Sequence, residues 1–352
     1  MRNVRIVLVG LGNLGRRFCE TVAVKESLLA DRYGLSLTLV GAADSRGAAY
    51  SVEGLDLGKV SEIKLAGGTI GDYPGVGQPG WGAVELVRAA EADVLMDASP
   101  VNLDAGAEPG LMCIRTAMNK GWHVITPNKG PLVVAFRELH ELAREKNVAF
   151  RYDGTVAGGL PALNVGCRDL RGAQLSLLEA VPNLVTGYVM DMLADGTSWE
   201  DATAKARAEG VLESPPEWDL DGWDAAAKLV ILANAVLGCD AKIDDVERAG
   251  VRTVPTTELV AARARGEKYR LLARAELQDD GSYRLSAVPT PLASSHPLGR
   301  LGRKQMGVVY TTDIYGTITC IIDEPNPVPS SATMLRDLLD IYVDDSTTLV
   351  IG

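Results

Sequence analysis

A strand that runs directly into a glycine-rich turn is the feature that most constrains how this chain folds. The apolar segment VRIVLVG spans residues 4–10 and ends on the first glycine of GLGNLG, residues 10–15. In a nucleotide-binding βαβ unit, the first glycine permits the tight turn and the second lets a pyrophosphate approach the backbone. The third lets the helix pack on the strand. The pattern therefore predicts a parallel sheet that opens with a dinucleotide site, although an ordinary strand-to-helix turn is the alternative.

The helix that begins in this turn is expected to hold the phosphates. Its first backbone N–H groups have no partner within the helix, and together with the helix dipole they attract an anion. We predict that the dinucleotide contacts the residues of the turn, namely Gly10, Gly12, Asn13, Leu14 and Gly15.

An acidic residue ends the second predicted strand, which covers residues 35–44. The carboxylate of Asp44 suits a ribose 2′-hydroxyl, as in NAD-binding units. Two residues later, Arg46 offers a planar guanidinium that matches a 2′-phosphate. The sequence leaves the choice between NAD and NADP open, and Arg46 slightly favours NADP.

Strands and helices alternate up to residue 154, as a doubly wound parallel sheet requires. In such sheets ligands bind where the strands end. The predicted strands at 92–99 and 122–130 end in polar residues, so we expect one ligand-binding edge that contains Ser99, Pro100, Thr126, Asn128 and Lys129.

A glycine-rich hinge at 155–161 separates this first domain, residues 1–154, from a second one at 155–323. The second contains alternating or β-branched segments, which predict antiparallel strands in a mixed sheet. A last helix, at 330–343 with a serine cap, lies in a segment 324–352 that we expect to return to the first domain. The predicted fold is α/β, a Rossmann-type doubly wound parallel sheet plus an α+β substrate and dimerisation domain with a mixed sheet.

Three acidic residues and one lysine are spaced around a predicted helix start between residues 213 and 228. Asp224 and Lys228 are four residues apart, so they share one helix face. Glu213 and Asp219 precede them in a proline-rich loop. Carboxylates can hold an ammonium group while the lysine meets an oxygen that gains or loses a proton, which suits a small amino-alcohol or amino-aldehyde.

A solvated loop before an amphipathic helix is the simpler interpretation of these charges. It is weakened by the helix itself, AAAKLVILANAVLG at 225–238, in which Lys228 is the only charge. A lysine in a buried helix has a partner or a function.

Composition argues against several classes of partner. The formal net charge is −11 and there is no basic run, so we expect no nucleic-acid or anionic membrane partner. No segment reaches the roughly 18 to 20 apolar residues of a membrane span, and no signal peptide is evident. Five cysteines stand singly, a pattern typical of reduced thiols, so we expect a cytoplasmic protein.

The motifs occur in an order that resembles the homoserine dehydrogenase family, in its short form without a C-terminal regulatory domain. The resemblance covers nearly the whole chain. It rests on GLGNLG, on TPNKG at 126–130, on DGTVAGGLP at 153–161, on ESPPEWDLDGWDAAAKL at 213–229, on HPLG at 296–299 and on the start of the SSATMLRDL helix.

The resemblance implies reversible hydride transfer between a nicotinamide and L-aspartate 4-semialdehyde, which gives L-homoserine. It implies that Lys129 and Lys228 are catalytic, with Asp224 holding Lys228 in place, and that the chain forms a homodimer. The implied substrate contacts are Glu213, Asp219, Asp224, Asn183 and Thr186, and a monovalent cation is implied near Asp153, Val156, Ala157 and Gly159.

Two segments depart from the family pattern. NLVTGYVM at 183–190 stands where the family has a stretch like NGTTNYIL, and DEPNPVPSS at 323–331 replaces a glycine-rich segment. A dehydrogenase of another small hydroxy compound is therefore a second hypothesis. A non-enzymatic nucleotide-binding redox sensor is a third, but it requires a DNA-binding segment or an exposed partner helix, and the sequence displays neither.

Overall fold

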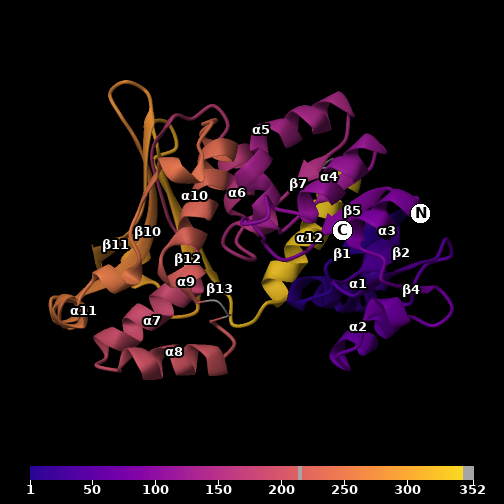
Figure 1. Ribbon diagram of the computed structural model, residues 1–352. Helices are drawn as coiled ribbons and strands as arrows, with labels where there is room; N and C mark the ends of the chain where they lie inside the picture. The colour runs from indigo at the N-terminus through magenta and orange to yellow at the C-terminus, as the bar shows by residue number, and fades with distance from the viewer. Residues whose placement is uncertain (213–215, 344–352) are drawn as a thin grey trace. The chain divides into compact units, whose positions relative to one another are not determined.

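The computed structural model describes residues 1–212 and 216–343, which form two compact units, each built on its own sheet. The first unit consists of Met1–Gly159 together with the chain from Asn326 onward, and the second is Leu160–Pro325. Figure 1 shows the elements of both.

The first unit contains a seven-stranded sheet in the order β4-β3-β2-β1-β5-β6-β7. The five strands from β2 to β7 in this order are parallel, whereas β3 and β4 add an antiparallel edge. The strands are β1 (Arg2–Val9), β2 (Leu35–Ala43), β3 (Gly47–Tyr50), β4 (Gly77–Pro79), β5 (Val94–Asp97), β6 (His123–Ile125) and β7 (Phe150–Arg151).

Strand register brings the polar strand ends together. Val9 is paired with Ala43 of β2 on one side and with Asp97 of β5 on the other. In parallel strands this alignment places the residues that follow each strand at one edge of the sheet. The turn after β1, Asp44 after β2 and Ser99 after β5 therefore share that edge.

Amphipathic helices cover the first sheet: α1 (Asn13–Tyr33), α2 (Leu57–Leu65), α3 (Ala83–Ala89), α4 (Gly110–Asn119), α5 (Lys129–Glu145) and α12 (Val328–Tyr342). The last of these, yellow in Figure 1, packs against α1 although more than two hundred residues separate them in sequence. Its Met334 and Leu338 are buried in the same apolar core as Ile6 and Leu8 of β1.

The second unit contains a six-stranded mixed sheet in the order β13-β12-β8-β10-β11-β9. Its neighbours are antiparallel except for the parallel pair β11 and β9. The strands are β8 (Leu175–Val181), β9 (Val246–Arg248), β10 (Glu267–Leu277), β11 (Tyr283–Ala293), β12 (Gln305–Thr312) and β13 (Thr317–Asp323), and the helices are α6 (Ala162–Asn164), α7 (Leu184–Ala194), α8 (Trp199–Ala208), α9 (Glu217–Leu220), α10 (Trp223–Val236) and α11 (Thr256–Ala264).

A buried ion pair fixes α7 on this sheet. Arg270 of β10 is 1% exposed, and its guanidinium binds both carboxylate oxygens of Asp191 at 2.8 and 3.1 Å. The same guanidinium donates to the carbonyls of Tyr269 and Leu301, so its charge is well satisfied. This bidentate contact sets the position of the helix whose first turn carries Asn183 and Thr186.

The predicted fold class is confirmed, with a parallel-rich first sheet and a mixed second sheet. Two local predictions were wrong. The last helix has no serine cap, because it begins earlier, after Pro327, and Ser331 is buried inside it. The helix expected at 132–147 begins at Lys129, because Asn128 caps it by accepting a hydrogen bond from the N–H of Gly130. In the described part of the chain, no helix is long and apolar enough to cross a membrane.

Candidate active site

The glycine turn of the first unit has the geometry that a phosphate site requires. Gly10 has a φ of +88°, and a β-carbon there would lie 2.3 Å from the carbonyl oxygen of Ala98. A β-carbon on Gly15 would lie 1.9 Å from the oxygen of Gly10. At Gly12, by contrast, nothing lies within 4 Å of the added carbon, so the approach to the backbone is open. Gly12 also caps α1 without a side chain, which leaves that helix end to a ligand.

Asp44 and Arg46 both contact the segment that follows α2. The carboxylate of Asp44 accepts hydrogen bonds from Lys64 Nζ at 2.5 Å, from Thr69 Oγ1 at 2.8 Å and from the N–H of Ile70 at 3.0 Å. Arg46 donates to the carbonyls of two glycines, Gly67 and Gly68. Burial alone would raise the pKa of Asp44, but these donors lower it to about 2. The carboxylate is therefore charged throughout the physiological range.

A buried acid holds the ends of β5 and β6 together. Asp97 is fully buried and accepts a hydrogen bond from Ser99 Oγ at 2.5 Å and from Asn128 Nδ2 at 3.2 Å. Thr126 Oγ1 donates to its backbone carbonyl at 3.0 Å. Burial raises the pKa of the Asp97 carboxyl, although its hydrogen bonds act in the opposite direction. Ser99, Thr126 and Asn128, three of the predicted cofactor residues, thus form one network around Asp97. Pro100, the fourth, follows Ser99 in the chain.

Lys129 comes next to this network in the chain. It is the first residue of α5 and its side chain is partly buried. The network leaves little room for change, because a β-carbon on Gly110 would lie 2.7 Å from Asp97 Oδ2. Asn128 of this network caps the helix that begins at Lys129, so the network and the start of α5 share one residue.

In the second unit, four of the predicted substrate and catalytic residues form one hydrogen-bonded cluster. Asn183 caps α7 through its Oδ1, and its Nδ2 donates to Asp219 Oδ1 at 2.6 Å and to Asp224 Oδ2 at 2.5 Å. Asp224 Oδ2 also lies 2.8 Å from Lys228 Nζ. Asn183 thus links two carboxylates that belong to different helices.

Lys228 is largely withdrawn from solvent. Its side chain is 13% exposed and that of Asp224 is 3% exposed. A second contact, 2.8 Å from Nζ to the backbone oxygen of Pro182, holds the ammonium at the end of β8. The ammonium of Lys228 is thus mostly shielded from water and held on two sides.

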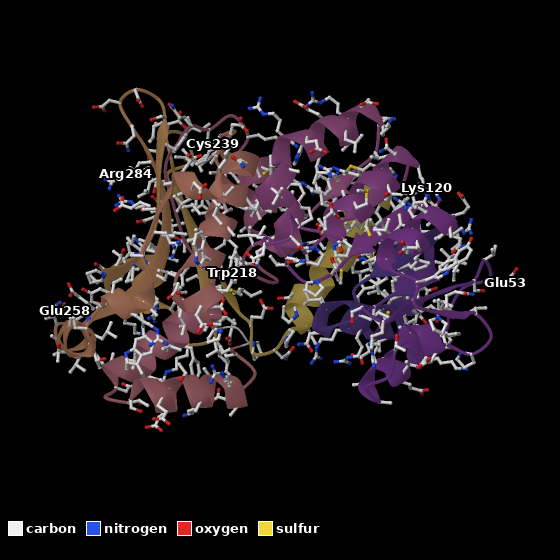
Figure 2. All side chains as sticks on the ribbon, in the orientation of Figure 1. Glu53, Lys120, Trp218, Cys239, Glu258 and Arg284 are labelled. Atoms are coloured by element: carbon white, nitrogen blue, oxygen red, sulfur yellow. The ribbon has the colours of Figure 1, made fainter. Side chains whose placement is uncertain are left out.

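Aromatic stacking supports the loop that carries this cluster. Trp218, labelled in Figure 2, stacks on Trp223 with ring centroids 6.2 Å apart. Arg248 lies over the ring of Trp223 at 3.7 Å and donates to the carbonyl of Asp221. Gly222 has a φ of +83° at the start of α10, a conformation that side-chain residues rarely adopt.

Two further predicted substrate residues have different outcomes. Thr186 is 1% exposed, and within the described ranges its hydroxyl oxygen has no hydrogen-bond partner. A buried hydroxyl without a partner is uncommon and suits a ligand contact. Glu213 lies outside the described residues.

The residues predicted to hold a monovalent cation lie at the end of the first unit. Asp153 and Gly159 are both contacted by the guanidinium of Arg336 from α12. Val156 and Ala157 are buried. Within the described parts, no group of three or more His, Cys, Asp or Glu side chains could hold a metal ion.

Known proteins resemble this chain over nearly its whole length. The family described as homoserine dehydrogenase matches residues 161–339. A homoserine dehydrogenase of Methanocaldococcus jannaschii is 30% identical over 338 residues, which cover 96% of this chain and 98% of that protein. This chain belongs to the homoserine dehydrogenase family.

Other homoserine dehydrogenases differ in the cofactor that their names state. An NAD(+)-dependent homoserine dehydrogenase of Pseudomonas canavaninivorans is 28% identical, with 97% of each chain covered. A hyperthermophilic archaeal homoserine dehydrogenase, solved in complex with NADPH, has a TM-score of 0.82 and 27% identity. That likeness covers 97% of this chain and 98% of the archaeal one.

Several residues that hold the two groups of site residues in place were not recognised from the sequence. Asp97 was included only as part of an apolar strand. A buried acid needs hydrogen-bond partners, so its presence there could have indicated a polar network. Lys64 and Arg270 gave no local signal, because their partners Asp44 and Asp191 are distant in sequence.

Proposed function

We propose that this chain is an NAD(P)-dependent homoserine dehydrogenase, which interconverts L-homoserine and L-aspartate 4-semialdehyde in amino-acid biosynthesis. The observation that carries the proposal is the partly buried cluster in which Asn183 joins Asp219 to Asp224 and Asp224 pairs with Lys228. Family membership supplies the reaction, and the cluster supplies the groups that such a reaction needs.

The first unit fits the cofactor. The open space above Gly12 and the start of α1, which no side chain caps, suit a pyrophosphate, with the turn from Gly10 to Gly15 around it, Asn13 and Leu14 included. We propose that Ser99, Pro100, Thr126 and Asn128 flank the nicotinamide half. The nicotinamide supplies the hydride chemistry, and the protein supplies orientation and a proton. We also propose that Asp44 and Arg46 recognise the adenosine ribose, with Arg46 binding the 2′-phosphate of NADP.

We propose that the second unit binds the amino acid and moves the proton. Asp219, together with Glu213, binds the ammonium group of the substrate. In the reducing direction, the ammonium of Lys228 donates a proton to the carbonyl oxygen, directly or through a water molecule, and Asp224 keeps Lys228 in place. The hydroxyl of Thr186 gives a further polar contact to the substrate.

Lys129 is assigned a role in the same reaction. We propose that its ammonium polarises the carbonyl oxygen and fixes the substrate. The Asp97 network supports this assignment, because it fixes Asn128, the residue that caps the helix beginning at Lys129. A charge held at a fixed place lowers the cost of the developing oxyanion without reorganisation during the reaction.

Assembly and location are parts of the same proposal. We propose that the enzyme is a homodimer built on the second unit, as the family resemblance implied. We further propose that it works in the cytoplasm, and the five cysteines support this because none is in a disulfide.

The proposal is tested with the purified protein, L-homoserine and either NAD⁺ or NADP⁺ at alkaline pH, where oxidation is favoured. Because residues 183–190 depart from the family pattern, the substrate could be another hydroxy compound. A panel of other small hydroxy acids is therefore the control. We expect cofactor reduction with L-homoserine and identification of aspartate semialdehyde as the product. Oxidation of another hydroxy acid but not of L-homoserine would leave the fold intact and refute the substrate.

A further inference from the structure

A single arginine of the C-terminal helix binds both ends of residues 153–159, a loop that overlaps the hinge predicted at 155–161 and is called the hinge loop below. The guanidinium of Arg336 donates to Oδ2 of Asp153 and, at 3.1 Å, to the carbonyl oxygen of Gly159. The Asp153 side chain is 2% exposed and that of Arg336 is 37% exposed. The guanidinium thus contacts two of the four residues that were predicted to hold a monovalent cation, Asp153 and Gly159.

The loop is closely fitted to this helix. A β-carbon on Gly154 would lie 2.4 Å from Thr333 Oγ1. The N–H of Asp153 donates to Asp337 Oδ2 at 3.2 Å. Two consecutive residues, Ala157 and Gly158, have left-handed φ angles of +55° and +58°. Because alanine adopts that conformation only at a cost, the surrounding contacts must hold it.

A metal cation would compete with the guanidinium for the same oxygens. Na⁺ and K⁺ need several oxygen ligands, whereas here one carboxylate oxygen and one carbonyl already accept hydrogen bonds from Arg336. A second positive charge at the same place would be repelled, and the repulsion is strong where water is excluded. Arginine does not lose its charge by deprotonation, so the guanidinium remains a cation near neutral pH.

We propose that the guanidinium of Arg336 takes the place of a monovalent cation, so that neither the hinge loop nor the activity of this enzyme depends on Na⁺ or K⁺. Arg336 is then a positioning residue, because it acts through the loop whose last residue, Gly159, precedes the second unit. The kinetic part of the test rests on the proposed function, whereas the melting part does not.

The first experiment compares the wild-type protein in NaCl, in KCl and in choline chloride at equal ionic strength. Choline is too large and too poor a partner for carbonyl oxygens to enter such a site. We expect the same thermal midpoint in all three salts, and L-homoserine oxidation that agrees within about twofold, because the site already holds its cation. A clear rise of either quantity in Na⁺ or K⁺ over choline would overturn the proposal.

The second experiment removes the guanidinium. In Arg336→Ala, the oxygens of Asp153 and Gly159 lose their protein cation, so we expect a lower midpoint that Na⁺ or K⁺ raises by several degrees over choline through binding to the folded state. Arg336→Gln keeps most of the side-chain length without the charge and carries the same test if the alanine variant does not fold. Arg336→Lys should behave as the wild type does toward these salts.

A matched control separates this effect from the loss of any ion pair on the same helix. Arg151 pairs with Asp340 of α12 at 2.6 Å and is 36% exposed, close to the exposure of Arg336. We expect Arg151→Ala to show no preference for Na⁺ or K⁺ over choline. If the Arg336 variants are as indifferent to the cation as Arg151→Ala, the guanidinium does not replace a cation and the proposal fails. Absence of homoserine oxidation in the wild type would refute the proposed function alone, since the melts still report on Arg336.

Discussion

Replacing Lys228 with methionine tests the proton relay most sharply, because methionine has an unbranched side chain that reaches the same ε position and carries no amine. Nζ lies 2.8 Å from Asp224 Oδ2 and 2.8 Å from the oxygen of Pro182. The substitution takes a donor from each of these acceptors. A buried acceptor that loses its donor costs about 1–3 kcal/mol, so we expect a measurably lower thermal midpoint.

The expected loss of turnover is much larger than this structural effect. Positioned acid–base groups contribute about 100- to 10,000-fold, so kcat of Lys228→Met should fall by that factor. The dissociation constant of the cofactor should stay near the wild-type value, because the predicted cofactor residues belong to the other unit. Stopped-flow or steady-state oxidation of L-homoserine, normalised to folded protein, measures the first quantity, and fluorescence titration measures the second.

A buried asparagine on the same helix provides the control. Asn234 of α10 is 7% exposed, and it both donates to and accepts from the backbone of Ala241. Asn234→Ala should lower the thermal midpoint by a similar amount and leave turnover per folded molecule near the wild-type value. Turnover of Lys228→Met within about threefold of the wild type would refute the relay, since a structural pair with Asp224 predicts stability loss alone.

Three further predictions follow from other residues. Lys129→Ala should lower kcat by about 100-fold or more with the cofactor still bound, which pre-steady-state kinetics beside a cofactor titration would show. Arg46→Ala should raise the Michaelis constant for NADP and leave that for NAD nearly unchanged; an unchanged NADP constant would make the arginine a purely structural contact to Gly67 and Gly68. The pKa of Asp44 is lowered to about 2, so its ionised form stabilises the fold above the usual carboxyl pKa, and this contribution is lost as the pH falls from about 4 through 2. Denaturant titrations should therefore show that the wild type exceeds Asp44→Asn by about 1–2 kcal/mol near neutrality, and that the difference shrinks in acid.

The parts of the fold that sequence predicted well are those fixed by local physics. The tasks of Gly10 and Gly15 follow from a positive φ and from close backbone approaches within one turn. The pairing of Asp224 with Lys228 follows from helical spacing, which brings residues four apart onto one face. The strands of both sheets were also predicted from local patterns, namely apolar runs and segments in which apolar and polar residues alternate.

Contacts between distant segments could not be predicted in this way. Asp44 meets Lys64 across 20 residues, and Arg336 meets Asp153 across 183 residues. Such pairs depend on the register of strands and on the packing of α12, which no local pattern specifies. The resemblance to a family suggested oxygen ligands at Asp153 and Gly159, but only the folded chain brings a guanidinium to them.

A crystal structure of the protein with NADP⁺ and L-homoserine tests the proposed proton relay directly. We expect the substrate hydroxyl within hydrogen-bonding distance of Lys228 Nζ, about 2.6–3.2 Å or one water molecule away, with its ammonium group on Asp219. Density that places the substrate hydroxyl away from both Lys228 and any water bound to it would refute the relay.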